Sequence, residues 1–268
     1  MFVSNSLSEK PTNKTTIPTK LKVLTALLVI VVIPIIFWSG WDVVHQTRNS
    51  ALILFTLLAV TTVPFYLSLP AVGTVVFMGD IYIMALAMMH GICTCVVAAL
   101  CYAMFISLAL ANRVRPHMLI FNFSGMVCGA FIYSAVFRLA KPTDAIGTTA
   151  LLLPAAVMAL TSFSFSSLLV ATATSWTSSK ASWQFWTRIR LRLSAHYLIA
   201  AAGATFVAVA WHDHTLLVVL AVAPLVGLSW GWTKWTKMYL TRPSARTQGS
   251  STPSGGNQEN PAFKSGTG

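Results

Sequence analysis

The chain has 268 residues, of which 56% are hydrophobic and only 9% are charged, whereas about a quarter of the residues in a soluble domain are charged. Its net charge is +12, but 15 of its 18 Lys and Arg residues fall in a few short segments between or beside apolar runs. This pattern is typical of membrane topology and not of a nucleic-acid-binding surface. Composition and charge therefore predict an all-α, polytopic transmembrane helix bundle that binds no nucleic acid.

The first apolar run follows a polar tail. Residues 1–21 include several lysines and lead into an uncharged stretch at residues 23–38. A secretory signal peptide begins in the same way, but this run lacks a small-x-small cleavage site and contains Pro34 and Trp38. We therefore predict an uncleaved first span, followed by a second span at residues 51–69.

The next apolar stretch, residues 75–111, is too long for one crossing. As one straight helix it would measure about 55 Å, nearly twice the hydrocarbon thickness of a bilayer. His90 and Gly91 are the natural break, because a polar ring followed by a glycine suits a turn at an interface. We expect segments at residues 75–89 and 92–111, and the first of them either crosses the bilayer or is re-entrant.

Further spans are predicted at residues 118–139, 148–174, 194–211 and 215–232, which gives eight segments in total. With a cytoplasmic N terminus, only three cations fall outside, namely Arg48, Arg138 and Lys141. If the long stretch were a single crossing, the best orientation would leave 12 cations inside and 6 outside, so the positive-inside rule favours the break. We predict a bacterial cytoplasmic membrane as the location, with both termini in the cytoplasm.

The membrane domain is expected at residues 22–240, because residues 241–268 are rich in Gly, Ser, Pro and Thr, which is typical of a disordered tail. Inside this domain, SWTSSKASWQFWTRIRLRL at residues 175–193 mixes aromatic and basic side chains. We interpret this segment as an interfacial anchor to the lipid bilayer, and a docking site for a cytoplasmic partner is the alternative. Its anchoring residues would be Trp176, Trp183, Trp186, Arg188, Arg190 and Arg192.

Asp80 is the one acidic residue expected inside the membrane, since the others fall in tails or predicted outer loops: Glu9, Asp42, Asp144, Asp213 and Glu259. A charge at a helix centre costs about 2.5 to 3.5 kcal/mol, so it usually meets a partner, a cavity or water. If the helix begins near Val75, Asp80 lies about one turn in, where a carboxylate favours the helix dipole. Two interpretations stay open, a helix-start residue and a ligand or proton site.

A second polar cluster occurs in FNFSGMVCG at residues 121–129. Asn122 and Ser124 need hydrogen-bond partners inside an apolar helix, and they join Asp80 as candidate ligand-binding residues. Gly125 and Gly129 belong to a small-residue face, for which close helix packing is the expected role.

Other motifs point to no chemistry. The four cysteines lie in apolar runs without a CxxC pair, and we interpret them as packing residues. His212, Asp213 and His214 are neighbours in a predicted outer turn, where adjacent residues rarely complete a metal site. We find no nucleotide loop, GxSxG elbow or HExxH motif. The sequence therefore predicts no catalytic residue, metal or cofactor, although polar residues from several helices could still converge as in an intramembrane hydrolase.

LPAVGTVVFMGDIYIMALAMMHG and RVRPHMLIFNFSG resemble the membrane-embedded sensory regions that precede diguanylate cyclase, HD-type phosphodiesterase or histidine kinase domains in bacterial signalling proteins. That pattern has a prolyl segment, a short helix with an early polar residue, a glycine turn, a second helix, a basic loop and Phe-Asn opening the next span. The corresponding residues here are Pro70, Asp80, Gly91, Arg113, Arg115, Phe121 and Asn122. No GGDEF or HD signature follows, so the resemblance implies a sensor that signals through a partner, acts by another route or is a remnant.

Two functions follow as hypotheses. The first is a non-enzymatic membrane sensor or interaction module that signals through a cytoplasmic partner or a homo-oligomer. The second is a small-solute transporter, or its membrane substrate-binding subunit, in which Asp80 and Asn122 line a pocket.

Overall fold

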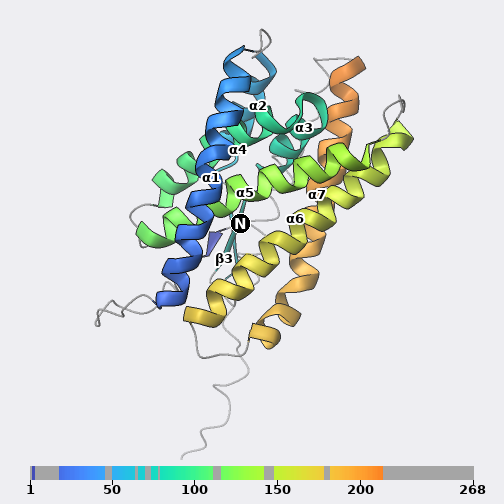
Figure 1. Cartoon of the computed structure of the whole chain (residues 1–268). Helices are drawn as coiled ribbons and strands as arrows, with labels where there is room; N and C mark the ends of the chain where they lie inside the picture. Colours follow the sequence, from blue (N-terminus) through green and yellow to red (C-terminus); the bar gives the residue numbers. More distant parts are fainter. Residues whose placement is uncertain are drawn as a thin grey trace, which may run out of the picture. The chain divides into compact units, whose positions relative to one another are not determined.

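The computed structural model describes residues 2–3, 18–45, 50–63, 66–69, 74–77, 79–110, 116–141, 148–177 and 182–213. The chain divides into two units, Met1–Thr233 and Lys234–Gly268, and all described residues lie in the first. These residues form seven helices and three short strands (Figure 1). The helices are α1 (Thr19–His45), α2 (Ser50–Thr61), α3 (Asp80–His90), α4 (Ile92–Leu110), α5 (Pro116–Ala140), α6 (Thr148–Thr177) and α7 (Ser182–Asp213).

Four of the described helices, α1, α4, α5 and α6, are long and apolar enough to cross a membrane. Large apolar side chains stand exposed along their outward faces, among them Phe37, Trp41, Leu108, Leu139 and Leu153. Such a surface suits lipid and is rare on a soluble protein. The helical membrane character predicted from composition is therefore confirmed in its coarse form. The predicted eighth span, residues 215–232, and the C-terminal tail, residues 241–268, lie outside the described residues.

Several predicted boundaries were wrong because helices continue past the ends of the apolar runs. Helix α1 reaches His45, so Asp42 lies in a helix and not in an outer loop. Helix α7 begins at Ser182 instead of residue 194, which makes most of the Trp-Arg segment helical and continuous with the predicted span. Asp213, predicted in an outer turn, is the last residue of α7. Hydropathy marks the apolar part of a helix, whereas backbone hydrogen bonding continues into polar sequence.

The break at Gly91 is confirmed. Helix α3 ends at His90 and α4 begins at Ile92, and Gly91 has φ of 88°, the one positive φ among the described residues. An L side chain rarely adopts this backbone conformation, which is why a glycine occupies the turn.

A small antiparallel sheet, which an all-α prediction did not include, takes two of its three strands from the sequence between α2 and α3. Strands β2 (Tyr66–Leu69) and β3 (Thr74–Phe77) pair in a hairpin with Tyr66 opposite Phe77, and β1 (Phe2–Val3) joins the other edge of β3. Both flanking spans were therefore predicted too long. The stretch TVPFYLSLPAVGTVVF has two prolines and β-branched runs, and these residues disfavour a helix and favour strands.

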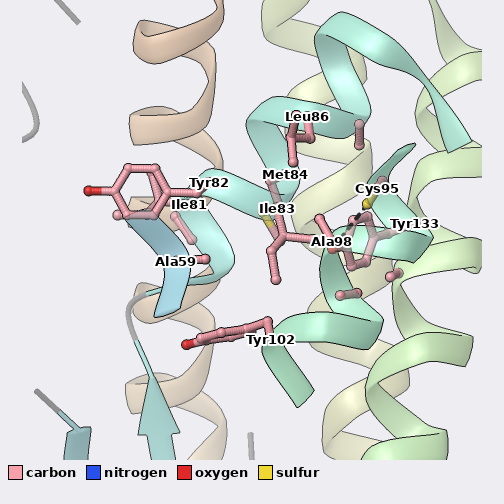
Figure 2. Packing of buried hydrophobic residues seen from close by; sticks show 14 of the residues in the cluster. Ala59, Ile81, Tyr82, Ile83, Met84, Leu86, Cys95, Ala98, Tyr102 and Tyr133 are labelled. Carbon is pink, nitrogen blue, oxygen red and sulfur yellow. Dashed lines mark hydrogen bonds between the residues drawn. The ribbon is translucent and has the colours of Figure 1, made fainter. Parts of the chain in front are cut away.

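Helix α3 is buried on every side. All residues from Ile81 to Met88 are buried, and the helix contacts α2, α4, α5 and α7. Figure 2 shows the resulting cluster, in which Ile83 of α3 lies beside Ala98 of α4 and close to Tyr133 of α5. A helix that is apolar all round belongs in the interior of a bundle. Asp80 is thus attached to the first turn of the most enclosed described helix.

The small-residue face of α5 lies against α6. A Cβ atom at Gly125 would be 3.1 Å from Leu169 Cδ1, and one at Gly129 would be 3.3 Å from Phe165 Cδ1. Both distances are tight, so larger side chains would push the two helices apart. The glycines occupy the position that the expected packing role requires.

Candidate functional site

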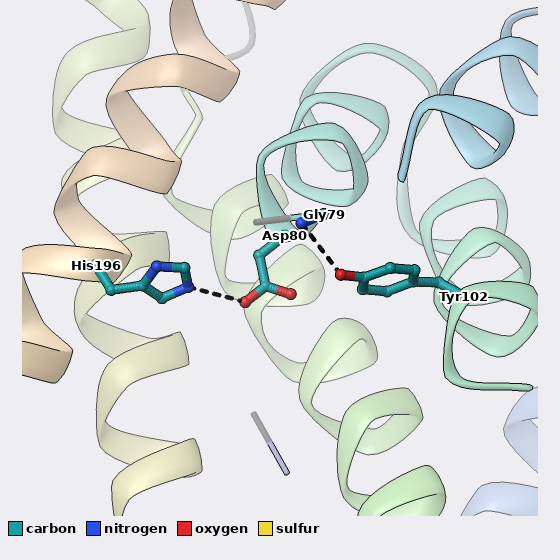
Figure 3. A network of polar contacts seen from close by, with 4 residues as sticks. All are labelled: Gly79, Asp80, Tyr102 and His196. Carbon is teal, nitrogen blue, oxygen red and sulfur yellow. Dashed lines mark hydrogen bonds and ion pairs between the residues drawn. The ribbon is translucent and has the colours of Figure 1, made fainter. Parts of the chain in front are cut away.

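Asp80 pairs with a histidine from the far end of the described sequence. His196 Nε2 of α7 lies 3.3 Å from Asp80 Oδ2, and the two side chains are 10% and 17% exposed. Figure 3 shows the imidazole directed at the carboxylate. Because an ionised carboxylate can only accept hydrogen bonds, Nε2 must carry the proton and donate it. The contact therefore joins α3 to α7 through a nearly enclosed polar bridge.

The bridge lies away from the ends of the helices that surround it. Asp80 follows Gly79, whose N–H group bonds to Tyr102, and Tyr102 stands about 15 Å from the start of α4 and about 12 Å from its end. His196 stands about 21 Å from the first residue of α7 and about 26 Å from the last. The pair is therefore near the middle of two long helices and not at their ends.

Asp80 is the first residue of α3, and the expectation that it lies one turn inside was wrong because the preceding residues form β3. Gly79 occupies the N-cap position and makes no side-chain hydrogen bond, since it has no side chain. A carboxylate in the first turn is favoured by the helix dipole. The two interpretations of Asp80 are thus compatible, because one carboxylate both starts the helix and meets a polar partner.

His196 is held by aromatic neighbours. Its ring packs edge-on against Tyr197, with 5.2 Å between ring centroids, and Tyr197 packs in the same manner against Phe163 of α6 at 6.4 Å. The largest set of helix contacts in the described chain is that between α6 and α7. This packing fixes the side of α7 that faces α3, and so it directs the imidazole at Asp80.

Hydroxyl and thiol groups gather around the bridge. The Tyr102 hydroxyl of α4 bonds to the residue before Asp80, and the Tyr197 ring of α7 packs on His196. Cys95 Sγ lies 3.7 Å from the Tyr133 hydroxyl, and all four side chains are buried. These groups can donate hydrogen bonds, whereas His196 can also neutralise a carboxylate. The bridge can therefore hold a proton between a carboxylate and an imidazole.

The structure places the other predicted site residues on α5, α6 and α7. Asn122 and Ser124 are buried in α5. Trp176, near the end of α6, is half-buried and packs on the apolar core. The remaining anchor residues occupy the first turns of α7, where the structure describes the backbone but not the side chains: Trp183, Trp186, Arg188, Arg190 and Arg192.

Sequence reasoning missed His196. The signal that could have found it is the shortage of other partners, because an acidic residue in an apolar interior needs one and His196 was one of few ionisable residues at a predicted span. The contact between α3 and α7 joins residues 116 positions apart, and no local sequence pattern indicates it.

Among the described residues, no cluster of three or more His, Cys, Asp or Glu side chains is placed to hold a metal ion. Comparisons with family models, with curated proteins and with solved structures find no match for this chain. Function must therefore be argued from the site itself.

Proposed function

We propose that the protein is a non-enzymatic, multi-pass membrane protein that works as a sensory module, with the Asp80–His196 bridge as its input site. Eight segments in the bacterial cytoplasmic membrane and cytoplasmic termini belong to this proposal. The distribution of cations and the resemblance to membrane-embedded sensory regions support it.

Contacts at one end of the bundle support the alternating topology. Asp42, near the end of α1, and Arg138, near the end of α5, both lie close to Cys93 at the start of α4. The C-terminal ends of α1 and α5 therefore lie level with the N-terminal end of α4. In the proposed topology these three ends lie on the outer side.

The observation that carries the proposal is the bridge between a short enclosed helix and a long continuous one. A sensor needs an element with two arrangements that an input can bias. A proton or small polar ligand that binds Asp80 competes with His196, and it therefore favours an arrangement in which α3 and α7 are released from each other. Thr205 of α7 also contacts Met88 of α3, at 3.9 Å, so the two helices run alongside each other beyond the bridge.

Helix α7 supplies the output. The helix is continuous from Ser182 through His196. A change in the packing around His196 is therefore transmitted along the helix to its first turns. Those turns include the Trp-Arg segment, whose composition suits an anionic lipid surface or a cytoplasmic partner. Release of the bridge is thus converted into a change in how residues 182–193 lie at the cytoplasmic surface.

Hydrogen–deuterium exchange in lipid nanodiscs tests this function. We expect Asp80→Asn and His196→Gln each to raise amide exchange in residues 182–193 by about tenfold, which corresponds to about 1.4 kcal/mol of lost local stability. The control is His90→Gln, because His90 is exposed at the other end of α3. Unchanged exchange in both bridge variants would contradict the proposal.

One observation favours transport as a second candidate. Helices α2 and α3 are about 18 Å and 16 Å long, too short to cross about 30 Å of hydrocarbon, and a β-hairpin separates them. Transporters often place their binding sites at such broken helices, near the centre of the membrane. Asp80 lies at this break.

Purified protein in liposomes separates the two functions. If the chain is a transporter, it should accumulate a small cationic or polar solute in response to a proton gradient, and Asp80→Asn should abolish that flux. Protein-free liposomes and the His90→Gln variant serve as controls. Capture of a partner by residues 175–193, without flux, would count against transport.

A further inference from the structure

A tyrosine of α4 contacts the backbone at the point where α3 begins. Tyr102 of α4 is fully buried, and its hydroxyl accepts a hydrogen bond from the Gly79 N–H group at 3.1 Å (Figure 3). The first N–H groups of a helix have no partner within the helix, and Gly79 is the N-cap residue of α3. Tyr102 therefore provides from a neighbouring helix the acceptor that the local sequence lacks.

The same hydroxyl also reaches the end of α2. Tyr102 hydrogen-bonds with the side chain of Thr62, and Thr62 Oγ1 donates to the Ala59 carbonyl at 2.6 Å. The Tyr102 hydroxyl therefore contacts both the residue at which α3 begins and the residue that follows α2.

We propose that Tyr102, supported by Thr62, is a positioning residue that fixes the start of α3 and thereby directs the Asp80 carboxylate at His196. Asp80 follows Gly79 directly, so the orientation of the Gly79 peptide sets the direction of its side chain. The first turn is then closed by the Tyr82 N–H group bonding to Gly79 O at 3.1 Å. This inference rests on the proposed function only in taking the bridge as the input site.

Solid-state NMR of the full-length protein in lipid, with ¹⁵N-labelled histidine, tests the inference. The chain has six histidines, and His196→Gln identifies the signals of His196. We expect Tyr102→Phe to move the His196 ring nitrogen signals toward those seen in Asp80→Asn. Thr62→Val should move the His196 signals in the same direction. Thr62→Ser keeps the hydroxyl and should leave these signals at their wild-type positions.

Tyr82→Phe is the matched control, because Tyr82 is a buried tyrosine whose ring packs against Phe55 of α2. It should leave the His196 signals in place, even if it lowers thermal stability. In the Asp80→Asn background, Tyr102→Phe should add no further shift. Unmoved His196 signals in Tyr102→Phe, or an equal movement in Tyr82→Phe, would overturn the positioning role.

Failure of this inference can be told apart from failure of the proposed function. The nitrogen signals report the bridge alone, whereas amide exchange in residues 182–193 reports its output. Shifted His196 signals with unchanged exchange would support positioning by Tyr102 and contradict the sensory function. Raised exchange in Asp80→Asn, with unmoved His196 signals in Tyr102→Phe, would contradict positioning and leave the sensory function supported.

Discussion

Replacement of His196 by leucine should lower the free energy of unfolding by about 3 kcal/mol. The leucine removes the partner of Asp80, whose side chain is 17% exposed. The carboxylate must then remain charged without a partner or take up a proton in an apolar interior, and both states are less stable than the paired one. Equilibrium unfolding in mixed detergent micelles measures the loss.

The double variant Asp80→Leu with His196→Leu separates the bridge from simple loss of packing. It leaves no buried charge, so it should recover most of the stability that His196→Leu loses. His90→Leu is the control, and its effect should stay within about 0.5 kcal/mol because His90 is exposed. If the double variant is no more stable than His196→Leu, the carboxylate is not the source of the loss.

The sequence predicted well those features that depend on neighbouring residues. The turn at Gly91 follows from the length limit on an apolar run and from the tolerance of glycine for positive φ. The bounds of α4 and α5 agree within two residues with the predicted spans, because both helices end where the apolar sequence ends.

Features that depend on distant contacts were not predictable in the same way. Strand β3 contains a valine-rich stretch that is equally compatible with a buried helix by hydropathy, and its pairing with β1 joins residues more than 70 positions apart. The same limitation hid the role of Tyr102. A tyrosine in an apolar helix is common, and its sequence does not reveal that the hydroxyl accepts a hydrogen bond from the Gly79 N–H group.

Replacement of Gly79 by alanine should destabilise the fold by about 2 kcal/mol and break the Asp80–His196 bridge. An added Cβ atom would lie less than 3.0 Å from three atoms of the Tyr102 side chain, closer than real Cβ atoms approach other groups. Tyr102 is enclosed and cannot swing away, so the start of α3 must move instead. The expected signature combines lower stability with His196 nitrogen signals like those of Asp80→Asn.

Two variants show whether this steric conflict is the cause. Gly40 lies in α1 with no atom near the position of an added Cβ, so Gly40→Ala should be neutral or stabilising, by at most about 1 kcal/mol. Tyr102→Leu removes the ring that an alanine at position 79 would meet, so Gly79→Ala should cost much less in that background than in the wild type. Equal costs in the two backgrounds would mean that contact with the Tyr102 ring is not the source of the loss.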